Sequence, residues 1–163
     1  VSACSRFWMP ILQLRACADM RMPDVNVLLG AFRQDAVGHE ALRDWLEAEV
    51  RSGRPVGLSP AVITGTVRLL TNHRIFAKPD SIQTALSHID QLLAQPGVIV
   101  AGPGPRHWQI FAGLCADADA RGNLVSDAAH AAVAIEHGAR WVTLDRDFAR
   151  FPGLVWEAPS LNR

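Results

Sequence analysis

The stretch WVTLDRDFARFPGLVW, residues 141–156, holds the order of elements that decides the fold. WVTL predicts a buried strand, and LVW at residues 154–156 predicts a last one. Between them, Asp145 follows the first strand directly, Asp147 lies two residues further on, and residues 146–150 predict a short helical turn. Because ligands of an open parallel sheet bind where its strands end, these two acids are expected at the ligand-binding edge.

Strands and helices alternate through the rest of the chain. Residues 22–32, MPDVNVLLGAF, predict a short buried strand that turns into a helix. Further apolar strands are predicted at residues 56–59 and 98–102. Helical patterns lie at residues 40–50, 60–71, 82–93, in the later part of 103–122, and at 127–138. Apolar strands that alternate with helices are typical of a parallel sheet covered by helices on both faces, so the expected fold class is α/β.

Local signals mark several helix ends and faces. Ser59 before a proline, then Asp80 or Ser81, and finally Ser126 are predicted N-caps. One buried helix face is predicted from apolar spacing, namely Ile82, Leu86, Ile89, Leu92 and Leu93. The tryptophans predicted in the core are Trp45, Trp108, Trp141 and Trp156. Trp108 follows the loop PGPRH, and its alternative role is to stack on a base.

Length and composition place these elements in one domain. The chain has 163 residues, and residues 22–163 form the predicted domain without a repeat or a linker. Residues 1–21 are predicted to be an N-terminal extension, either a packed arm or sequence upstream of a start at Met20 or Met22. They lack the continuous apolar segment of a signal peptide. No stretch reaches the about 20 apolar residues of a membrane span.

Charge and cysteine content narrow the function. The formal net charge is zero, which argues against a protein that holds nucleic acid by bulk charge alone. A net charge of zero is still compatible with a nuclease, because the negative charge of an acidic metal site offsets the positive charge of a basic binding surface. Three cysteines without a CxxC motif or a Cys/His cluster argue against a disulfide scaffold and a zinc site. They agree with a reducing cytoplasm, which is the predicted location.

Four aspartates are expected at strand ends or helix starts on one edge of the sheet. They are Asp24, Asp127, Asp145 and Asp147. Taken singly, each has an ordinary explanation as a turn residue or as an acid in a first helical turn. Clustered carboxylates repel one another, and a hard cation such as Mg²⁺ or Mn²⁺ relieves that repulsion through oxygen ligands. A bound water of lowered pKa is a suitable nucleophile for a phosphodiester, so the cluster predicts metal-dependent hydrolysis.

Three stretches resemble the PIN-domain family, and more closely its VapC-type toxins of bacterial toxin–antitoxin pairs. They are MPDVNVLL, LVSDAAHAAVAIEHGA and WVTLDRDFARFPGLVW, and the resemblance covers roughly residues 22–159. It implies an α/β/α sandwich with a central parallel sheet and Mg²⁺- or Mn²⁺-dependent endoribonuclease activity. It also implies an RNA substrate, a cognate antitoxin and a homodimer.

The resemblance assigns roles to individual residues. Asp24, Asp127, Asp145 and Asp147 match the family's metal-binding acids. Asn26 and Thr143 match polar positions near them, to which we give supporting roles; both are also ordinary helix caps at a strand–helix junction.

One position departs from the family pattern. Many PIN domains carry a glutamate on the helix that here reads SPAVITGTVRLLTN, and Gly65 takes its place. This glycine marks a VapC-like subgroup and puts a second metal ion in doubt. Glu40 is a weaker candidate for the missing acid, because an acid at a helix start is expected from the helix dipole alone.

Basic side chains near these positions are candidates for substrate binding. Arg68 and Arg146 flank Gly65 and Asp145 and are predicted to bind phosphate, with a surface ion pair as the equal alternative. His130 lies one turn beyond Asp127, and a structural role is favoured for it.

The predicted function is that of a metal-dependent endoribonuclease toxin. Two rivals stay open at this point. One is a metal-dependent DNase or phosphatase, and the other is a weak or inactive PIN-like binding module in which Gly65 is a trace of decay.

Overall fold

A computed structural model describes residues 19–161, and most of the predicted N-terminal extension lies outside them. Within this range, five strands form one parallel sheet in the order β3-β2-β1-β4-β5. The strands are β1 (Arg21–Pro23), β2 (Val56–Leu58), β3 (Val98–Val100), β4 (Arg140–Val142) and β5 (Trp156–Glu157). Met20, which belongs to the predicted extension, is fully buried.

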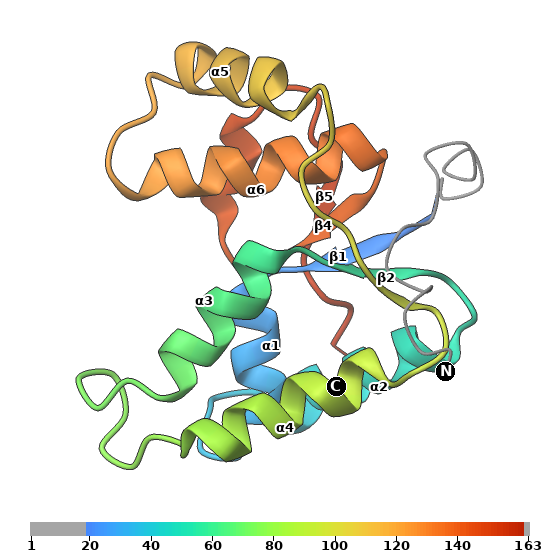
Figure 1. The fold of residues 1–163 in the computed structure, drawn as a ribbon, viewed down its shortest axis with the longest axis vertical. Coiled ribbons are helices and arrows are strands. Elements are labelled where there is room, and N and C mark those ends of the chain that lie inside the picture. The colour runs from blue at the N-terminus through green and yellow to red at the C-terminus, as the bar shows by residue number, and fades with distance from the viewer. Residues whose placement is uncertain (1–18, 162–163) are drawn as a thin grey trace, which may run out of the picture.

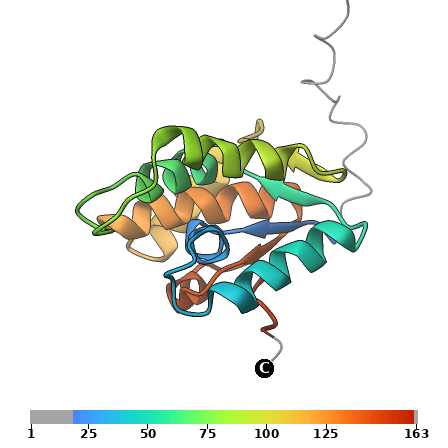
Figure 2. The same ribbon diagram turned by 90° about the horizontal axis from the view of Figure 1, so that it is seen from below.

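Helices connect the strands and cover both faces of the sheet. They are α1 (Val25–Phe32), α2 (His39–Arg51), α3 (Pro60–Leu70), α4 (Ile82–Leu93), α5 (His107–Asp117), α6 (Asn123–His137) and the 3-10 helix η2 (Arg146–Arg150). In Figure 1, α1 to α4 lie below the sheet and α5 and α6 lie above it. Figure 2 looks from below, with α2 and α4 in front of the strands. The expected α/β/α sandwich is confirmed.

The strand order creates a switch point at the centre of the sheet. The chain runs outward from β1 to β2 and then to β3. Helices α5 and α6 form the connection back across the sheet, and β4 and β5 follow on the other side of β1. β1 and β4 pair in register, with Pro23 opposite Val142. Connections diverge from this pair, so the crevice at its carboxyl end is the expected ligand site of such a sheet.

Most predicted helix signals are confirmed. Ser59 accepts a hydrogen bond from the Val62 backbone N–H and precedes a proline at the first helical position. Ser81, and not Asp80, caps α4 by accepting from the Thr84 backbone N–H. Such caps satisfy backbone donors that the helix itself leaves unpaired.

The prediction that Ser126 caps the late helix is wrong. Helix α6 begins at Asn123, after Gly122, whose positive φ of 57° suits glycine. Leu124 packs partly buried against the core, which favours the extra turn. Asp127 therefore lies in the second turn of α6, and not in its first.

Two predictions about buried apolar residues also need correction. Ile82 and Leu86 are 48% and 47% exposed, because only the Ile89 and Leu92 side of α4 faces the core. Trp108 is 74% exposed on α5, although Trp45 and Trp141 are buried as expected. Helical spacing identifies the apolar face of a helix, but it does not show which part of that face is covered by the rest of the protein.

The core lies between the sheet and the two helical layers. Trp141, Phe148, Met22, Leu28 and Leu58 are its largest fully buried side chains together with Met20 and Leu70. No helix in residues 19–161 has both the length and the apolar character needed to cross a membrane.

Candidate active site at the carboxyl edge of the sheet

Asp24 occupies the junction between β1 and α1 and is the best-held acid of the four. It is the N-cap of α1, and its Oδ1 accepts a hydrogen bond of 2.6 Å from the Val25 backbone N–H. Its backbone N–H donates to the carbonyl of Val142 on the neighbouring strand β4. Only 7% of the residue is exposed. The carboxylate is therefore fixed at the switch point of the sheet.

Thr143 and Asn26 connect the β1–α1 junction to the β4–η2 junction. The Thr143 hydroxyl donates to Asp24 Oδ2 at 2.6 Å and accepts from the Asn26 side-chain amide at 3.0 Å. The same amide nitrogen donates to Asp24 Oδ2 at 2.9 Å. Asn26 Oδ1 accepts from the Leu144 backbone N–H at 3.1 Å, which closes the network. Both predicted supporting residues thus contact the acid or the strand end directly.

Asp145 and Asp147 follow β4 in the geometry of a helix cap. The backbone N–H of Asp145 donates to Thr143 Oγ1 at 3.0 Å, and Asp145 Oδ1 accepts from the Asp147 backbone N–H at 2.9 Å. Asp145 is the N-cap of η2, and Asp147 lies in its first turn. Both side chains are exposed to solvent. This part of the site is open, whereas the Asp24 part is closed.

The electrostatics agree with four acids gathered at one place. Burial first, and then the charges of Asp145, Asp24 and Asp147, raise the pKa of Asp127 to about 6. Burial also raises the pKa of Asp24, against hydrogen bonds from Thr143 and Val25 that lower it. Like charges that gather in this way favour a cation or a proton.

Other acids around the sheet have basic partners. Glu157 forms ion pairs with Arg21 at 2.9 Å and with Arg140 at 3.4 Å, and Glu49 pairs with Arg54 at 3.0 Å. The four carboxyl-edge aspartates form no ion pair with any basic residue among 19–161. Their negative charge is left for a ligand to balance.

The donor set fits a hard divalent cation in its chemistry. All four groups offer carboxylate oxygen, the ligand type that Mg²⁺ and Mn²⁺ prefer. As the side chains stand, however, no three His, Cys, Asp or Glu groups in the described part of the chain are placed to hold one ion. Carboxylates with mutual repulsion stay apart, so side-chain rotation is needed before several of them share a cation.

A family comparison matches this arrangement. The family model described as PIN domain matches residues 21–154, which include all four acids. The chain belongs to the PIN-domain family.

Within this family the chain is of the VapC type. It is 44% identical to the VapC ribonuclease Mb2897 of Mycobacterium bovis over 136 residues, which are 83% of this chain and 92% of that protein. It is 41% identical to Ribonuclease VapC25 of Mycobacterium tuberculosis over 142 residues, 87% of this chain and the whole of that protein.

Solved structures share the fold of this VapC-type chain. VapBC2 from Rickettsia felis, bound to a DNA fragment from its promoter, superposes with a TM-score of 0.66 at 18% identity, covering 85% of this chain and 98% of that one. VapC20 of Mycobacterium tuberculosis, described as a sarcin–ricin loop cleaving toxin, superposes with a TM-score of 0.57 at 18% identity, covering 83% and 98%. At these identities the likeness concerns the fold.

Gly65 of this VapC-type chain lies against the start of α1. A Cβ atom at this position would come within 3.1 Å of Val25 Cγ2, and Val25 follows Asp24 directly. The position at which the family resemblance predicts a glutamate is thus beside the residue that follows Asp24. Glu40 lies in the first turn of α2, near the far end of α1, which is about 12 Å long. The structure therefore does not place Glu40 among the acids.

Arg68, Arg146 and His130 surround the cluster in different ways. Arg68 and Arg146 are exposed, and neither forms an ion pair within residues 19–161, so the structure does not support the surface ion-pair alternative. His130 stacks on Trp141, with ring centroids 5.5 Å apart, and burial lowers its pKa against the charge of Asp24. Trp141 is fully buried, so this stacking anchors His130 on the core of the VapC-type chain and supports the structural role predicted for the histidine.

Proposed function

We propose that this protein is an endoribonuclease toxin that hydrolyses RNA phosphodiester bonds with Mg²⁺ or Mn²⁺. The observation that carries the proposal is the group of four aspartates without basic partners at the switch point of the sheet. The names of the VapC relatives, which are ribonucleases, support it. A PIN-family fold with this donor set is suited to phosphodiester hydrolysis, because a cation offsets charge on the phosphate oxygens.

The four aspartates have different tasks in this proposal. Asp24, Asp127 and Asp145 would hold the cation directly or through water, and Asp147 would hold it or orient a water molecule. When bound, the cation would supply positive charge for the phosphate and lower the pKa of a water molecule. Asn26 and Thr143 orient the Asp24 carboxylate through their hydrogen bonds. Arg68 and Arg146 would bind phosphates of the substrate on either side.

The test compares purified wild-type protein with Asp24→Asn and Asp145→Asn. Labelled RNA and DNA of matching sequence are incubated with Mn²⁺, with Mg²⁺ and with EDTA. We expect cleavage of RNA only, loss of cleavage in EDTA, and a decrease of about 100-fold or more in each variant. The matched control is Asp90→Asn, an exposed residue of α4 outside the cluster.

Each rival makes a different prediction in this assay. Equal cleavage of RNA and DNA, or of DNA alone, supports the DNase alternative and overturns the RNA proposal. No cleavage with any divalent ion, together with unchanged growth on expression, supports the inactive binding module. Growth arrest that Asp24→Asn abolishes is the expected result for a toxin.

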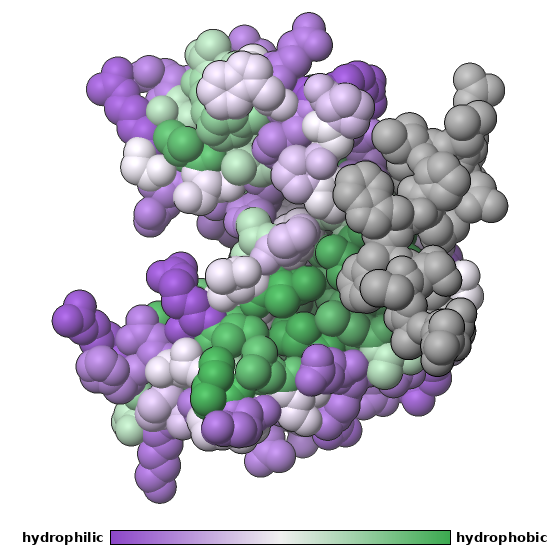
Figure 3. Space-filling view, viewed as in Figure 1, coloured by the Kyte–Doolittle hydropathy of each residue, from purple (hydrophilic) through white to green (hydrophobic). Residues whose placement is uncertain are grey.

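We further propose a cognate antitoxin and a homodimer. Solved structures of similar fold include VapBC complexes from Rickettsia felis and Salmonella typhimurium. Exposed apolar side chains gather on this chain at α4 and β3, with Ile82, Leu86 and Val100 each about half exposed. Figure 3 shows the apolar area that spans α3 and α4. Light scattering on the purified protein measures the oligomer, and Leu86→Lys is expected to convert a dimer into a monomer.

A further inference from the structure

Basic charge is concentrated in one part of the chain. Residues 50–79 contain no aspartate or glutamate, although they include arginine, lysine and histidine. Arg51 and Arg54, at the start of this region, pair with Glu47 and Glu49. Its later basic side chains are exposed and form no ion pair among residues 19–161; they are Arg68, His73, Arg74 and Lys78. We call residues 68–78 the basic arm.

The basic arm begins beside the acidic site. Helix α3 packs on the start of α1 at Gly65, next to Val25, and Arg68 lies one turn further along the same helix. Figure 1 shows α3 and the loop that follows it extending from the carboxyl edge of the sheet. Figure 3 shows the molecule hollowed on that side, between the part formed by α5 and α6 and the part formed by α3 and α4. Helix α3 lies on one side of this hollow, and the arm continues from the outer end of that helix.

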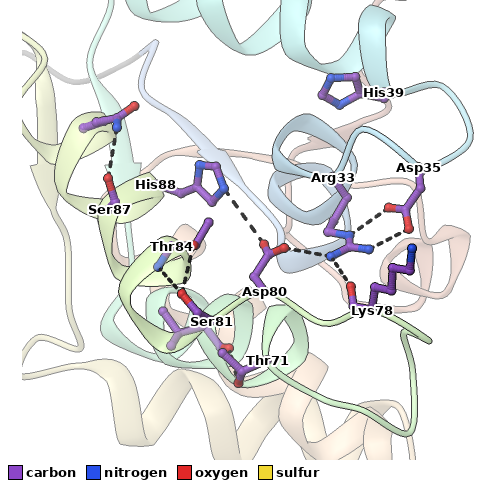
Figure 4. A network of polar contacts seen from close by, with 12 residues as sticks. Arg33, Asp35, His39, Thr71, Lys78, Asp80, Ser81, Thr84, Ser87 and His88 are labelled. Atoms are coloured by element: carbon purple, nitrogen blue, oxygen red, sulfur yellow. Dashed lines mark hydrogen bonds and ion pairs between the residues drawn. The ribbon is translucent and has the colours of Figure 1, made fainter.

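A buried arginine holds the main chain of the arm in place. Arg33 donates to the Lys78 carbonyl at 3.0 Å and to Asp80 Oδ1 at 2.8 Å, and its guanidinium lies 4.2 Å from the centre of the Phe76 ring. Figure 4 shows Asp35, Asp80 and the Lys78 carbonyl around the Arg33 guanidinium. Arg33 caps the end of α1, the helix that begins at Asp24. The arm is therefore fixed relative to the acids, at about the 12 Å length of α1.

We propose that the basic arm binds the phosphate backbone of the RNA strand beside the acidic site. This inference rests on the proposed function and adds a second contact surface to it. The acid cluster repels phosphates, so a strand held there needs a positive surface nearby. Arg68 and Arg74 suit this role because a guanidinium forms paired hydrogen bonds with phosphate oxygens. Lys78 contributes less, since its side chain extends toward Asp35 (Figure 4).

Binding of an uncut strand tests the inference apart from catalysis. Fluorescence anisotropy with a labelled single-stranded RNA is measured in EDTA over a range of salt concentrations, using the full chain. We expect Arg68→Ala/Arg74→Ala to weaken binding about tenfold or more at low salt. The slope of log K against log salt should become shallower by about 0.7 for each phosphate that the variant no longer neutralises. Lys78→Ala should change the slope less than Arg74→Ala.

The matched control is Arg43→Ala/Arg51→Ala on α2, where both side chains pair with Glu47. This control should bind RNA like the wild type. An unchanged salt slope in Arg68→Ala/Arg74→Ala, with cleavage still present, overturns the arm alone and makes an acidic protein its better partner. Absence of cleavage with every divalent ion overturns the proposed function instead. An equal loss of binding in both double variants overturns the arm, because it indicates bulk charge.

Discussion

Thr143 donates a hydrogen bond of 2.6 Å to Asp24 Oδ2 across 119 residues of sequence, and the threonine is completely buried. This contact joins the two strand ends that define the switch point. Burial raises the pKa of the Asp24 carboxyl group, and the hydrogen bond from Thr143 lowers it. A single methyl-for-hydroxyl exchange at Thr143 therefore tests whether this contact serves the site or only the fold.

We expect Thr143→Val to lower Mn²⁺ affinity or cleavage by about 10- to 100-fold, the usual effect of removing a group that orients a metal ligand. Because the hydrogen bond from Thr143 favours ionised Asp24, the acidic limb of the pH–rate profile should move to higher pH without it. Thr143→Ser keeps the hydroxyl and is the matched control. Equal activity of the Val and Ser variants would assign Thr143 to the fold alone.

The raised pKa of Asp127 leads to a prediction about the stability of the metal-free protein. Its folded-state pKa of about 6 lies above the ordinary value of 3.8. Between these pH values the folded protein therefore binds more protons than the unfolded protein does. The contribution of Asp127 to the free energy of unfolding should fall as pH rises from about 4 to about 6 and then level off. Asp127→Asn removes this cost and should stabilise the metal-free protein at pH 7, although cleavage is lost.

The gain at pH 7 should be at most about 1 kcal/mol, because the partly exposed group is screened by solvent. That corresponds to about 2–4 °C in the melting temperature. Thermal unfolding in EDTA at pH 4 and pH 7 measures it, and the two proteins should converge at pH 4. A difference that persists at pH 4 would point to packing and not to charge. High salt should reduce the difference, since part of it is Coulombic.

The sequence was sufficient to predict the alternating elements and the edge where the acids gather. Asp24 directly follows the apolar strand β1, Asp145 and Asp147 come shortly after β4, and parallel strands end at a common edge. The order of strands was not predictable in this way, because the place of β4 beside β1 depends on packing between distant segments. Thr143 and Asn26 were identified by family likeness, whereas their mutual hydrogen bond needed the structure.

The errors have local causes. A serine before an acid indicates a helix start, but the extra turn from Asn123 buries Leu124 partly and so overrides Ser126. The spacing of Ile82 and Leu86 predicts a buried face, yet α4 lies at the border of the molecule and leaves them exposed. Arg33 carries no motif at all. Its partners Lys78 and Asp80 are far along the chain, so only the fold reveals its role.

The close contact between Gly65 in α3 and Val25 leads to a prediction about a double mutant. Alanine in a helix is more stable than glycine by about 1 kcal/mol, but a Cβ here would come within 3.1 Å of Val25 Cγ2. We expect Gly65→Ala to be close to neutral in the wild type and to stabilise the Val25→Ala protein by about 1 kcal/mol. Urea unfolding of the four proteins measures the coupling. Equal effects in both backgrounds would show that Val25 does not constrain this position.

Arg33 should be among the most sensitive side chains outside the site. Its side chain is 8% exposed and pairs with Asp80, which is itself 18% exposed, and with the largely exposed Asp35. Removing one partner of a buried ion pair leaves the other charge uncompensated, so we expect Arg33→Ala to cost about 3 kcal/mol. Asp35→Ala, at the exposed end of the same network (Figure 4), should cost much less than Arg33→Ala, because solvent screens its carboxylate.

Urea unfolding of both variants measures this difference. The destabilisation in Arg33→Ala should be reduced in Arg33→Ala/Asp80→Asn, because the neutral amide no longer leaves a charge buried without a partner. If Arg33→Ala and Asp35→Ala were equally mild, Arg33 would not anchor the segment of residues 76–80. In that case the basic arm would have to be held by the packing of Phe76 alone, and RNA binding should then survive Arg33→Ala unchanged.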